Sequence, residues 1–279
     1  MYAVGMRLCA AILSSLLAVG CASTPEGTPP PPPAKPPVEV TPMVGAGSIL
    51  YVWTQIVPGP ALARAVVEGS GQPCPEIRLD ELSGVAMTPN PAQGAGAITV
   101  CEHPLVLPDG RPVSRAQVAD RLLPLPGSTP ERIAVIGDGD SGHGDGEWPL
   151  AQIANTVARR QSPTLVVYVG ERGCGESDWK SRQEGFFQPA DELLQVAPWL
   201  VPGSCGSILA ASGEESDPAL PASAMVRVYR DLLEAAGSPG FLMLVRDPDA
   251  GTWQATFSTP KGDETRTCRL LGGVFDCGV

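Results

Sequence analysis

The sequence has few histidines and a shortage of positive charge. Only 2 of its 279 residues are His, which leaves little material for the imidazole-rich sites that hold transition metals. Lys and Arg number 19 against 30 Asp and Glu, so the formal net charge is −11 at pH 7. An acidic surface repels phosphate backbones. Nucleic acid is therefore excluded as the main partner.

The N-terminal apolar run, Leu8–Leu17, is too short to span a bilayer comfortably. It follows a start that carries one positive charge and no acid, and it precedes the small residues Ala18-Val19-Gly20, which is the layout of an export signal over residues 1–20. Small residues that end directly on Cys21 resemble the lipobox of bacterial lipoproteins. This resemblance implies that Cys21 is acylated and anchors the chain to a membrane of the cell envelope, on its periplasmic or extracellular face. The alternative is a plain secretory signal in which Cys21 is incidental.

Residues 21–42 predict a linker. The stretch Ala22–Pro42 contains nine prolines, including the run Pro29–Pro33, and hardly any apolar side chains. Such a segment has no core to bury, so we expect it to stay extended and polyproline-like. It would hold the folded part of the chain some tens of Å from the membrane.

Cysteine usage agrees with export. The chain has 8 Cys, and setting aside Cys9 in the signal and Cys21 leaves six, an even number that predicts disulfides with 15 possible pairings. A metal site is the competing interpretation, but no C-x-x-C pair is present. Proximity in the sequence favours the pairs Cys74–Cys101, Cys174–Cys205 and Cys268–Cys277.

Residues 43–127 predict a β-rich domain. Ile49–Val57 is rich in β-branched and aromatic residues, and the shorter strand candidates are 61–67, 76–82 and 97–101, separated by Gly, Pro and Asn. Short strands at this spacing are typical of a small β-sandwich. His103, beside Pro104, is expected at a strand end and not as a ligand.

Residues 128–279 predict an α/β domain that ends in β-hairpins. The apolar run Ile133–Ile136 predicts a strand buried on both faces. A helix that opens at Glu147-Trp148-Pro149 and a second strand over Thr164–Val169 complete a βαβ unit with a parallel sheet. A helix then leads into a short strand over 186–200, and strand–turn–strand patterns cover 240–257 and 268–277. The fold class is therefore α+β or α/β, with a β-sandwich-like N-terminal domain.

The middle of this domain resembles the calcineurin-like metallophosphoesterases, including the purple-acid-phosphatase-like bacterial members. In that family a buried strand ends in GDxG, a later strand in GD plus an aromatic, and a third in GNHE. The series over 132–205 is similar, with Gly137-Asp138 after the first strand and Gly170-Glu171 after the second. The resemblance implies a truncated, degenerate metallophosphoesterase-like fold.

Position by position, the resemblance implies a damaged metal site. Asp138 matches the first metal-binding Asp, Asp140 replaces the second Gly, and Glu171 replaces the bridging Asp. The metal-binding Asn, the catalytic His and the Glu of the third motif correspond to Ser204, Cys205 and Gly206. No His follows His143, and 218–240 is too short for the half of the sheet that carries the later His motifs.

The hydrolytic chemistry of the family depends on metal ligands and a catalytic His that this sequence lacks. Two metals about 3.5 to 4 Å apart activate a hydroxide and clamp the phosphoryl oxygens, and neutral imidazoles keep such a site from becoming over-charged. We expect no catalytic residues, no required cofactor, and a role as an envelope binding or scaffolding module. The alternative is an active phosphoesterase with an atypical divalent-metal site built from Asp138, Asp140, His143 and Glu171. The glycine-rich stretch from Asp138 to Glu147 also offers oxygen ligands at alternate positions, which suit Ca²⁺, but a solvated acidic loop is the favoured interpretation of this stretch.

Overall fold

The computed structural model describes residues 47–90, 97–137, 149–170, 178–201, 222–271 and 274–277. The chain divides into two units between Pro42 and Met43, and every element below belongs to the second unit. Within the described ranges, no helix is long and apolar enough to cross a membrane.

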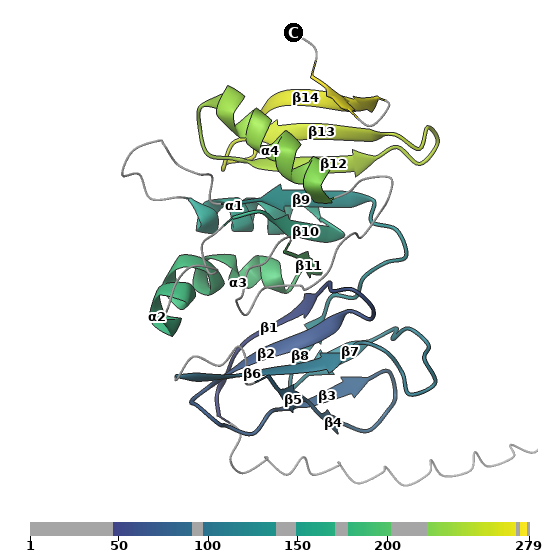
Figure 1. Ribbon diagram of the computed structural model, residues 1–279, viewed down its shortest axis with the longest axis vertical. Coiled ribbons are helices and arrows are strands. Elements are labelled where there is room, and N and C mark those ends of the chain that lie inside the picture. The colour runs from purple at the N-terminus through teal and green to yellow at the C-terminus, as the bar shows by residue number, and fades with distance from the viewer. Residues whose placement is uncertain are drawn as a thin grey trace, which may run out of the picture. The chain divides into compact units, whose positions relative to one another are not determined.

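The strands form two sheets (Figure 1). The larger sheet consists, among the described residues, of β1 (Ile49–Gln55), β2 (Leu62–Glu68), β5 (Thr88–Pro89), β6 (Ile98–Pro104), β9 (Arg132–Ile136), β10 (Leu165–Tyr168), β11 (Trp199–Leu200), β12 (Phe241–Arg246), β13 (Trp253–Ser258), β14 (Glu264–Leu271) and β15 (Val274–Asp276). Their order is β15-β14-β13-β12-β9-β10-β11-β1-β2-β6-β5. The smaller sheet consists of β3 (Glu76–Leu79), β4 (Val85–Ala86), β7 (Ala116–Val118) and β8 (Arg121–Leu123), in the order β4-β3-β7-β8.

The centre of the larger sheet is parallel. β9 pairs with β10, β10 with β11, and β11 with β1, all in parallel. The expected βαβ unit is present, because α1 (Leu150–Thr156) lies between β9 and β10 in the sequence. The four residues of the run Ile133–Ile136 are all buried, as expected for a strand covered on both faces.

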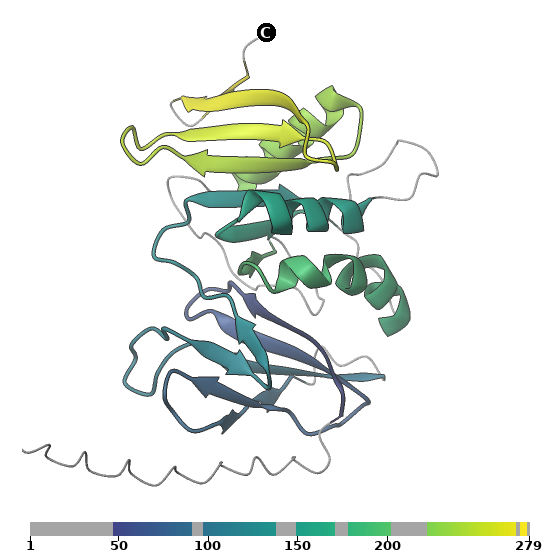
Figure 2. The ribbon, with the colours of Figure 1, turned by 180° about the vertical axis from the view of Figure 1, so that it is seen from behind.

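Helices cover both faces of this central section. α1 continues into the π-helical segment η1 (Val157–Gln161), and α2 (Trp179–Arg182), η2 (Gln183–Phe187) and α3 (Gln188–Leu194) follow one another without a break. Successive residues of β9 point to opposite faces: Ala134 and Ile136 pack in the core that contains α1 and α3, whereas Ile133 and Val135 pack in the core that contains α4 (Ala222–Ala236). Figures 1 and 2 show α4 on one face and α1 and α3 on the other.

Sequence analysis did not predict α4. Its buried side chains Met225, Tyr229 and Leu232 recur at three- and four-residue spacing, which is the period of a helix with one buried face. They cover β9, β12 and β13, so in the described structure this face of the sheet is closed by a single helix.

The larger sheet contains strands from both sides of the boundary that the sequence predicts after residue 127. The β-rich segment does form two packed β layers, because β1 and β2 share a core with the smaller sheet through residues such as Val52, Ala65 and Ile77. However, β1 also pairs with β11, and Ile56 N donates to Trp199 O at 2.7 Å. Residues on either side of position 127 therefore build one continuous sheet. The reason is that β1 is buried on both faces: Trp53 packs against the helices and Val52 against the smaller sheet.

The C-terminal hairpins agree with the sequence patterns. β12 and β13 are antiparallel neighbours joined by a turn in which Asp247 Oδ1 accepts hydrogen bonds from Asp249 N and Ala250 N, each at 3.0 Å. β14 and β15 pair in the same way, and a disulfide joins Cys268 to Cys277. A second disulfide joins Cys74 to Cys101. These are two of the three pairs that sequence proximity favoured.

Candidate functional site

The carboxyl ends of β9, β10 and β11 lie along one edge of the sheet. The three strands are parallel neighbours, with Ile136 opposite Tyr168 and Val167 opposite Leu200. The described chain continues past them to Gly137, Gly170 and Val201. Open α/β sheets bind ligands outside the carboxyl ends of their parallel strands, so this edge is the candidate functional site.

Two strand ends are packed against each other at this edge. A Cβ atom on Gly137 would lie 2.8 Å from Val169 Cγ2 and 3.3 Å from Gly170 N. Val169 N donates to Ile136 O at 2.8 Å, which continues the β9–β10 ladder by one more hydrogen bond. Only glycine fits at position 137 without a shift of these neighbours, so the points where the chain leaves β9 and β10 are closely constrained.

Tyr229 of α4 packs against the same edge, on the face of the sheet opposite to α1 and α3. Its buried hydroxyl lies 3.2 Å from Gly240 O and 3.4 Å from Gly137 O, so it can donate to either carbonyl. Its ring lies close to Gly137 as well, with Cε1 3.1 Å from the position of a Cβ. Sequence analysis missed Tyr229 because it did not predict the helix that carries it.

A second group that sequence analysis missed is the end of β1, which reaches the same edge because β1 is parallel to β11. Gln55 is fully buried, and its Oε1 accepts a hydrogen bond from Trp53 Nε1 at 3.0 Å. Its Nε2, and Oγ1 of the neighbouring Thr54, have no hydrogen-bond partner within the described part of the chain. Buried polar atoms without partners are rare in folded proteins, so these two atoms are unusual in having unsatisfied hydrogen-bonding capacity within the described part of the chain.

The predicted metal-site residues themselves are not among the residues that the structure describes. Asp138 is the next residue in sequence after Gly137, and Glu171 is the next after Gly170. Outside the described ranges there also fall Asp140, His143, Ser204, Cys205, Gly206, Cys21 and the expected Cys174–Cys205 pair. What the structure describes is the scaffold from which these segments start.

The remaining candidate residues lie near a strand end or in the hydrophobic core. His103 lies near the end of β6, where Nδ1 is 2.7 Å from Pro104 O, in agreement with the expected strand-end position. Trp179 and Trp199 are buried in the core beside Phe186 and Phe187. Across the residues that the structure describes, no three or more His, Cys, Asp or Glu side chains are grouped so that they could hold a metal ion.

Two carboxylates have a pKa that local hydrogen bonds lower. The Asp178 carboxylate accepts hydrogen bonds from the backbone N–H and the hydroxyl of Ser181, which hold its pKa below the usual range. Asp80 is similar: hydrogen bonds from the Ser114 hydroxyl and from the backbone N–H groups of Arg115 and Ser114 lower its pKa. Both are turn or helix-cap interactions, so they mark local structure and not a reaction centre.

No protein-family model and no curated protein matches this sequence. Among solved structures, a purple acid phosphatase isolated from yellow lupin (Lupinus luteus) seeds is similar, with 12% sequence identity and a TM-score of 0.38. The match covers 57% of this chain and 35% of the phosphatase chain, so this chain spans about a third of that protein. A purple acid phosphatase is a metallophosphoesterase, but a likeness at this TM-score does not assign the chain to a family.

Proposed function

We propose that this chain is an exported lipoprotein, anchored to a membrane of the cell envelope through Cys21, whose folded unit has a degenerate metallophosphoesterase-like fold and acts as a non-catalytic binding or scaffolding module. The observation that carries the proposal is the parallel register of β9, β10 and β11. It brings to one edge of the sheet the strand ends that directly precede the three altered motifs.

The residue types in those motifs argue against hydrolysis. A two-metal centre needs ligands that hold both ions and leave them able to activate water. The three motifs supply Asp138 and Glu171 as carboxylates, whereas Ser204 and Cys205 stand in place of an Asn and a His. A protein that has kept the sheet and lost the neutral nitrogen ligands is suited to holding a partner at this edge and not to cleaving a phosphoester.

Export is supported by a separate observation. Disulfides form and persist mainly in oxidising compartments, and the Cys74–Cys101 and Cys268–Cys277 bridges agree with a location outside the cytoplasm.

Metal analysis of the purified full chain tests the catalytic part of the proposal. We expect less than stoichiometric transition metal by elemental mass spectrometry, and no hydrolysis of p-nitrophenyl phosphate above the buffer rate with Mn²⁺, Zn²⁺ or Fe²⁺. Two bound metals per chain, with turnover that Asp138→Ala abolishes and that Asp120→Ala leaves intact, would establish the active phosphoesterase instead. Asp120 is a suitable control because it is an exposed carboxylate beside β8, remote in sequence from the three motifs.

A further inference from the structure

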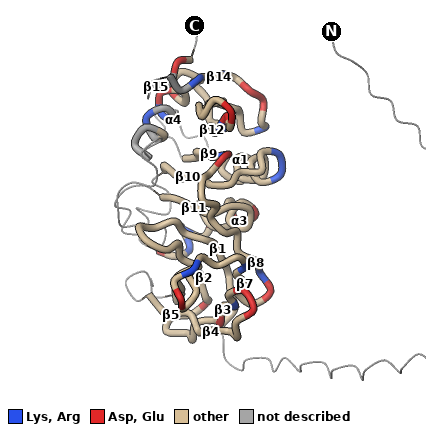
Figure 3. The backbone as a smooth tube through the Cα atoms, turned by 90° about the vertical axis from the view of Figure 1, so that its right-hand side faces the viewer, with Lys and Arg blue, Asp and Glu red and all other residues tan. Residues whose placement is uncertain are grey.

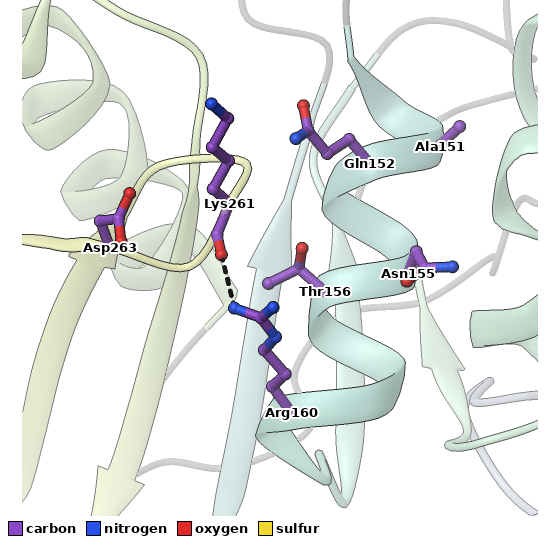
Figure 4. Close-up of a pocket in the computed structure, with 7 residues that line it drawn as sticks. All are labelled: Ala151, Gln152, Asn155, Thr156, Arg160, Lys261 and Asp263. Atoms are coloured by element: carbon purple, nitrogen blue, oxygen red, sulfur yellow. Dashed lines mark hydrogen bonds between the residues drawn. The ribbon is translucent and has the colours of Figure 1, made fainter.

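A cavity of about 690 Å³, open to solvent, lies between α1 and the turn that connects β13 to β14 (Figure 4). Small-molecule sites in proteins fall in the range of roughly 300 to 1,000 Å³. Gln152, Asn155 and Arg160 line it from α1 and η1, and Lys261 and Asp263 line it from the turn. It involves none of the residues at the carboxyl edge of the parallel strands.

The two walls of this cavity are joined by backbone anchors. Thr156 Oγ1 donates to Pro260 O at 2.7 Å, and Arg160 Nη1 donates to Lys261 O at 3.0 Å. Gly262 has a φ of +90°, and a Cβ atom there would lie 3.0 Å from Thr156 Cγ2. The turn is therefore held against the helix by its main chain, which leaves its side chains available for other contacts.

Three polar side chains around the cavity are unused. Lys261, Asp263 and Gln152 are exposed, and within the described structure their side-chain groups make no hydrogen bond or ion pair. Asn155 differs from them, because its Nδ2 donates to Glu192 Oε2 at 3.1 Å. The cavity thus presents an ammonium, a carboxylate and an amide that have no internal role.

The charge around the cavity is opposite in sign to that of the chain. Arg160 and Lys261 contribute two positive charges and Asp263 one negative charge, whereas the chain as a whole has a net charge of −11. Figure 3 shows positively charged residues at the end of α1, where η1 contributes Arg159 and Arg160. Arg159 Nε lies 2.8 Å from Glu192 Oε1 and forms an ion pair with it. Arg160 is the arginine that lines the cavity.

We propose that this cavity binds a small hydroxylated anion, one that carries a phosphate or a carboxylate group. The Lys261 ammonium pairs with the anionic oxygens, and the Gln152 amide donates a hydrogen bond to them, since charge-assisted hydrogen bonds are the stronger class. The Asp263 carboxylate accepts hydrogen bonds from the ligand's hydroxyl groups. This site is separate from the proposed function at the sheet edge and does not depend on it.

Three ligands built on the same sugar test the proposal. The full chain, labelled with ¹⁵N, is titrated with glucose 6-phosphate, with gluconate and with glucose, and binding is followed by NMR. We expect saturable shifts of the Gln152 side-chain amide and of the Lys261 and Gly262 backbone amides with at least one of the two anions. Glucose should leave them unchanged. The comparison of the two anions shows whether the site takes phosphate or carboxylate.

The variant Lys261→Ala keeps the backbone carbonyl that Arg160 contacts, so the turn should stay docked. We expect its dissociation constant for the bound anion to rise at least fivefold while signals remote from the cavity stay in place. Lys180→Ala, which removes an exposed lysine of α2, is the matched control and should bind as the unmodified chain does. Absence of saturable shifts with both anions, equal shifts with glucose, or equal weakening by Lys180→Ala would overturn the proposal.

Discussion

Two buried threonine hydroxyls differ in whether they have a partner. Thr54 Oγ1, near the end of β1, has none within the described part of the chain, whereas Thr156 Oγ1 donates to Pro260 O. A buried hydroxyl without a partner loses its hydration and gains no hydrogen bond in return, while a paired one contributes roughly 0.5 to 1.5 kcal/mol. Replacing threonine by valine should therefore change the free energy of unfolding in opposite directions at the two positions.

Thr54→Val is expected to raise the free energy of unfolding by about 1 kcal/mol, because valine has nearly the same shape and no hydroxyl to desolvate. Thr156→Val is expected to lower it by about 1 kcal/mol, because it leaves the Pro260 carbonyl without this donor. Urea denaturation of both variants measures the two signs. Destabilisation by both substitutions would show that Thr54 has a partner.

Gly137→Ala tests the close packing at the candidate edge. The added methyl would meet Val169, the Tyr229 ring and Gly170 N, so we expect a loss of about 1 to 3 kcal/mol from overpacking. Gly127→Ala is the control, since the nearest atom to its Cβ would be Thr129 O at 3.9 Å. Urea denaturation should show little change for the control, and equal effects of the two substitutions would contradict the packing at Gly137.

At the scale of secondary-structure elements, the run from α2 to α3 begins at a side-chain cap. Asp178 has extended backbone angles, and its Oδ1 accepts a hydrogen bond from Ser181 N at 2.9 Å. This is the geometry of an N-cap, which satisfies a donor that the helix itself cannot. Because α3 contributes Ala190, Leu193 and Leu194 to the core, the cap stabilises an element that covers the central strands.

The cap predicts a pH dependence. Hydrogen bonding holds the folded-state pKa of Asp178 below that of the unfolded chain, so its stabilisation is complete above the ordinary carboxyl pKa of about 3.9 and is lost as the pH falls through the folded-state value. Asp178→Ala should lower the melting temperature at pH 7, and the difference should narrow as the pH falls below the ordinary carboxyl pKa and through the lower folded-state value. Asp178→Asn keeps an acceptor and should lower it less. A difference independent of pH would contradict this role of the carboxylate.

The two observed disulfides close loops of different length. Cys74–Cys101 spans 27 residues of separation and Cys268–Cys277 spans 9. On the chain-entropy estimate, replacing both cysteines by Ala costs ~3.5 kcal/mol for the first pair and ~2.5 kcal/mol for the second. Urea denaturation of the two double variants measures which pair contributes more to the free energy of unfolding. A larger loss of this free energy on removal of Cys268–Cys277 would mean that native-state contacts outweigh loop entropy.

At the scale of the whole molecule, one sheet connects segments that differ in composition. The apolar, mostly parallel strands β9, β10 and β11 meet the antiparallel strands β1, β2 and β6 through the β11–β1 pair. Removing either side would expose the edge of a buried strand, and exposed edges promote aggregation. The folded unit should therefore lose its structure in a single cooperative step.

The proposed membrane attachment through Cys21 is also tested on the whole chain. Cys21→Ser removes the thiol that would be acylated, and acyl chains anchor by burying methylene groups at about 0.8 kcal/mol each. We expect the variant to move from the membrane fraction to the soluble fraction on cell fractionation, while Cys9→Ser in the signal stays with the membrane. Equal membrane association of both variants would show that Cys21 is not the anchor.

Local patterns were sufficient to predict many elements. The apolar run Ile133–Ile136 predicts a strand buried on both faces, and its four residues are buried. The helix predicted after Trp148-Pro149 is α1, and it buries Leu150, Ile153 and Ala154. Helix α4 was not predicted, although its buried residues Met225, Tyr229 and Leu232 have helical spacing. Gly137 was recognised as part of a motif, but its contacts with Val169 and Tyr229 were not predictable.

Residue order along the chain thus accounts for the features that depend on near neighbours: the hydrophobic periods and the two close cysteine pairs. Tertiary structure alone decided that β1 pairs with β11, that Tyr229 reaches Gly137, and that a turn after β13 docks on α1. The physical reason is that these contacts join residues about 90 to 145 positions apart. Backbone hydrogen bonds accept any partner strand, so the choice depends on how side chains pack once both faces of each strand are covered.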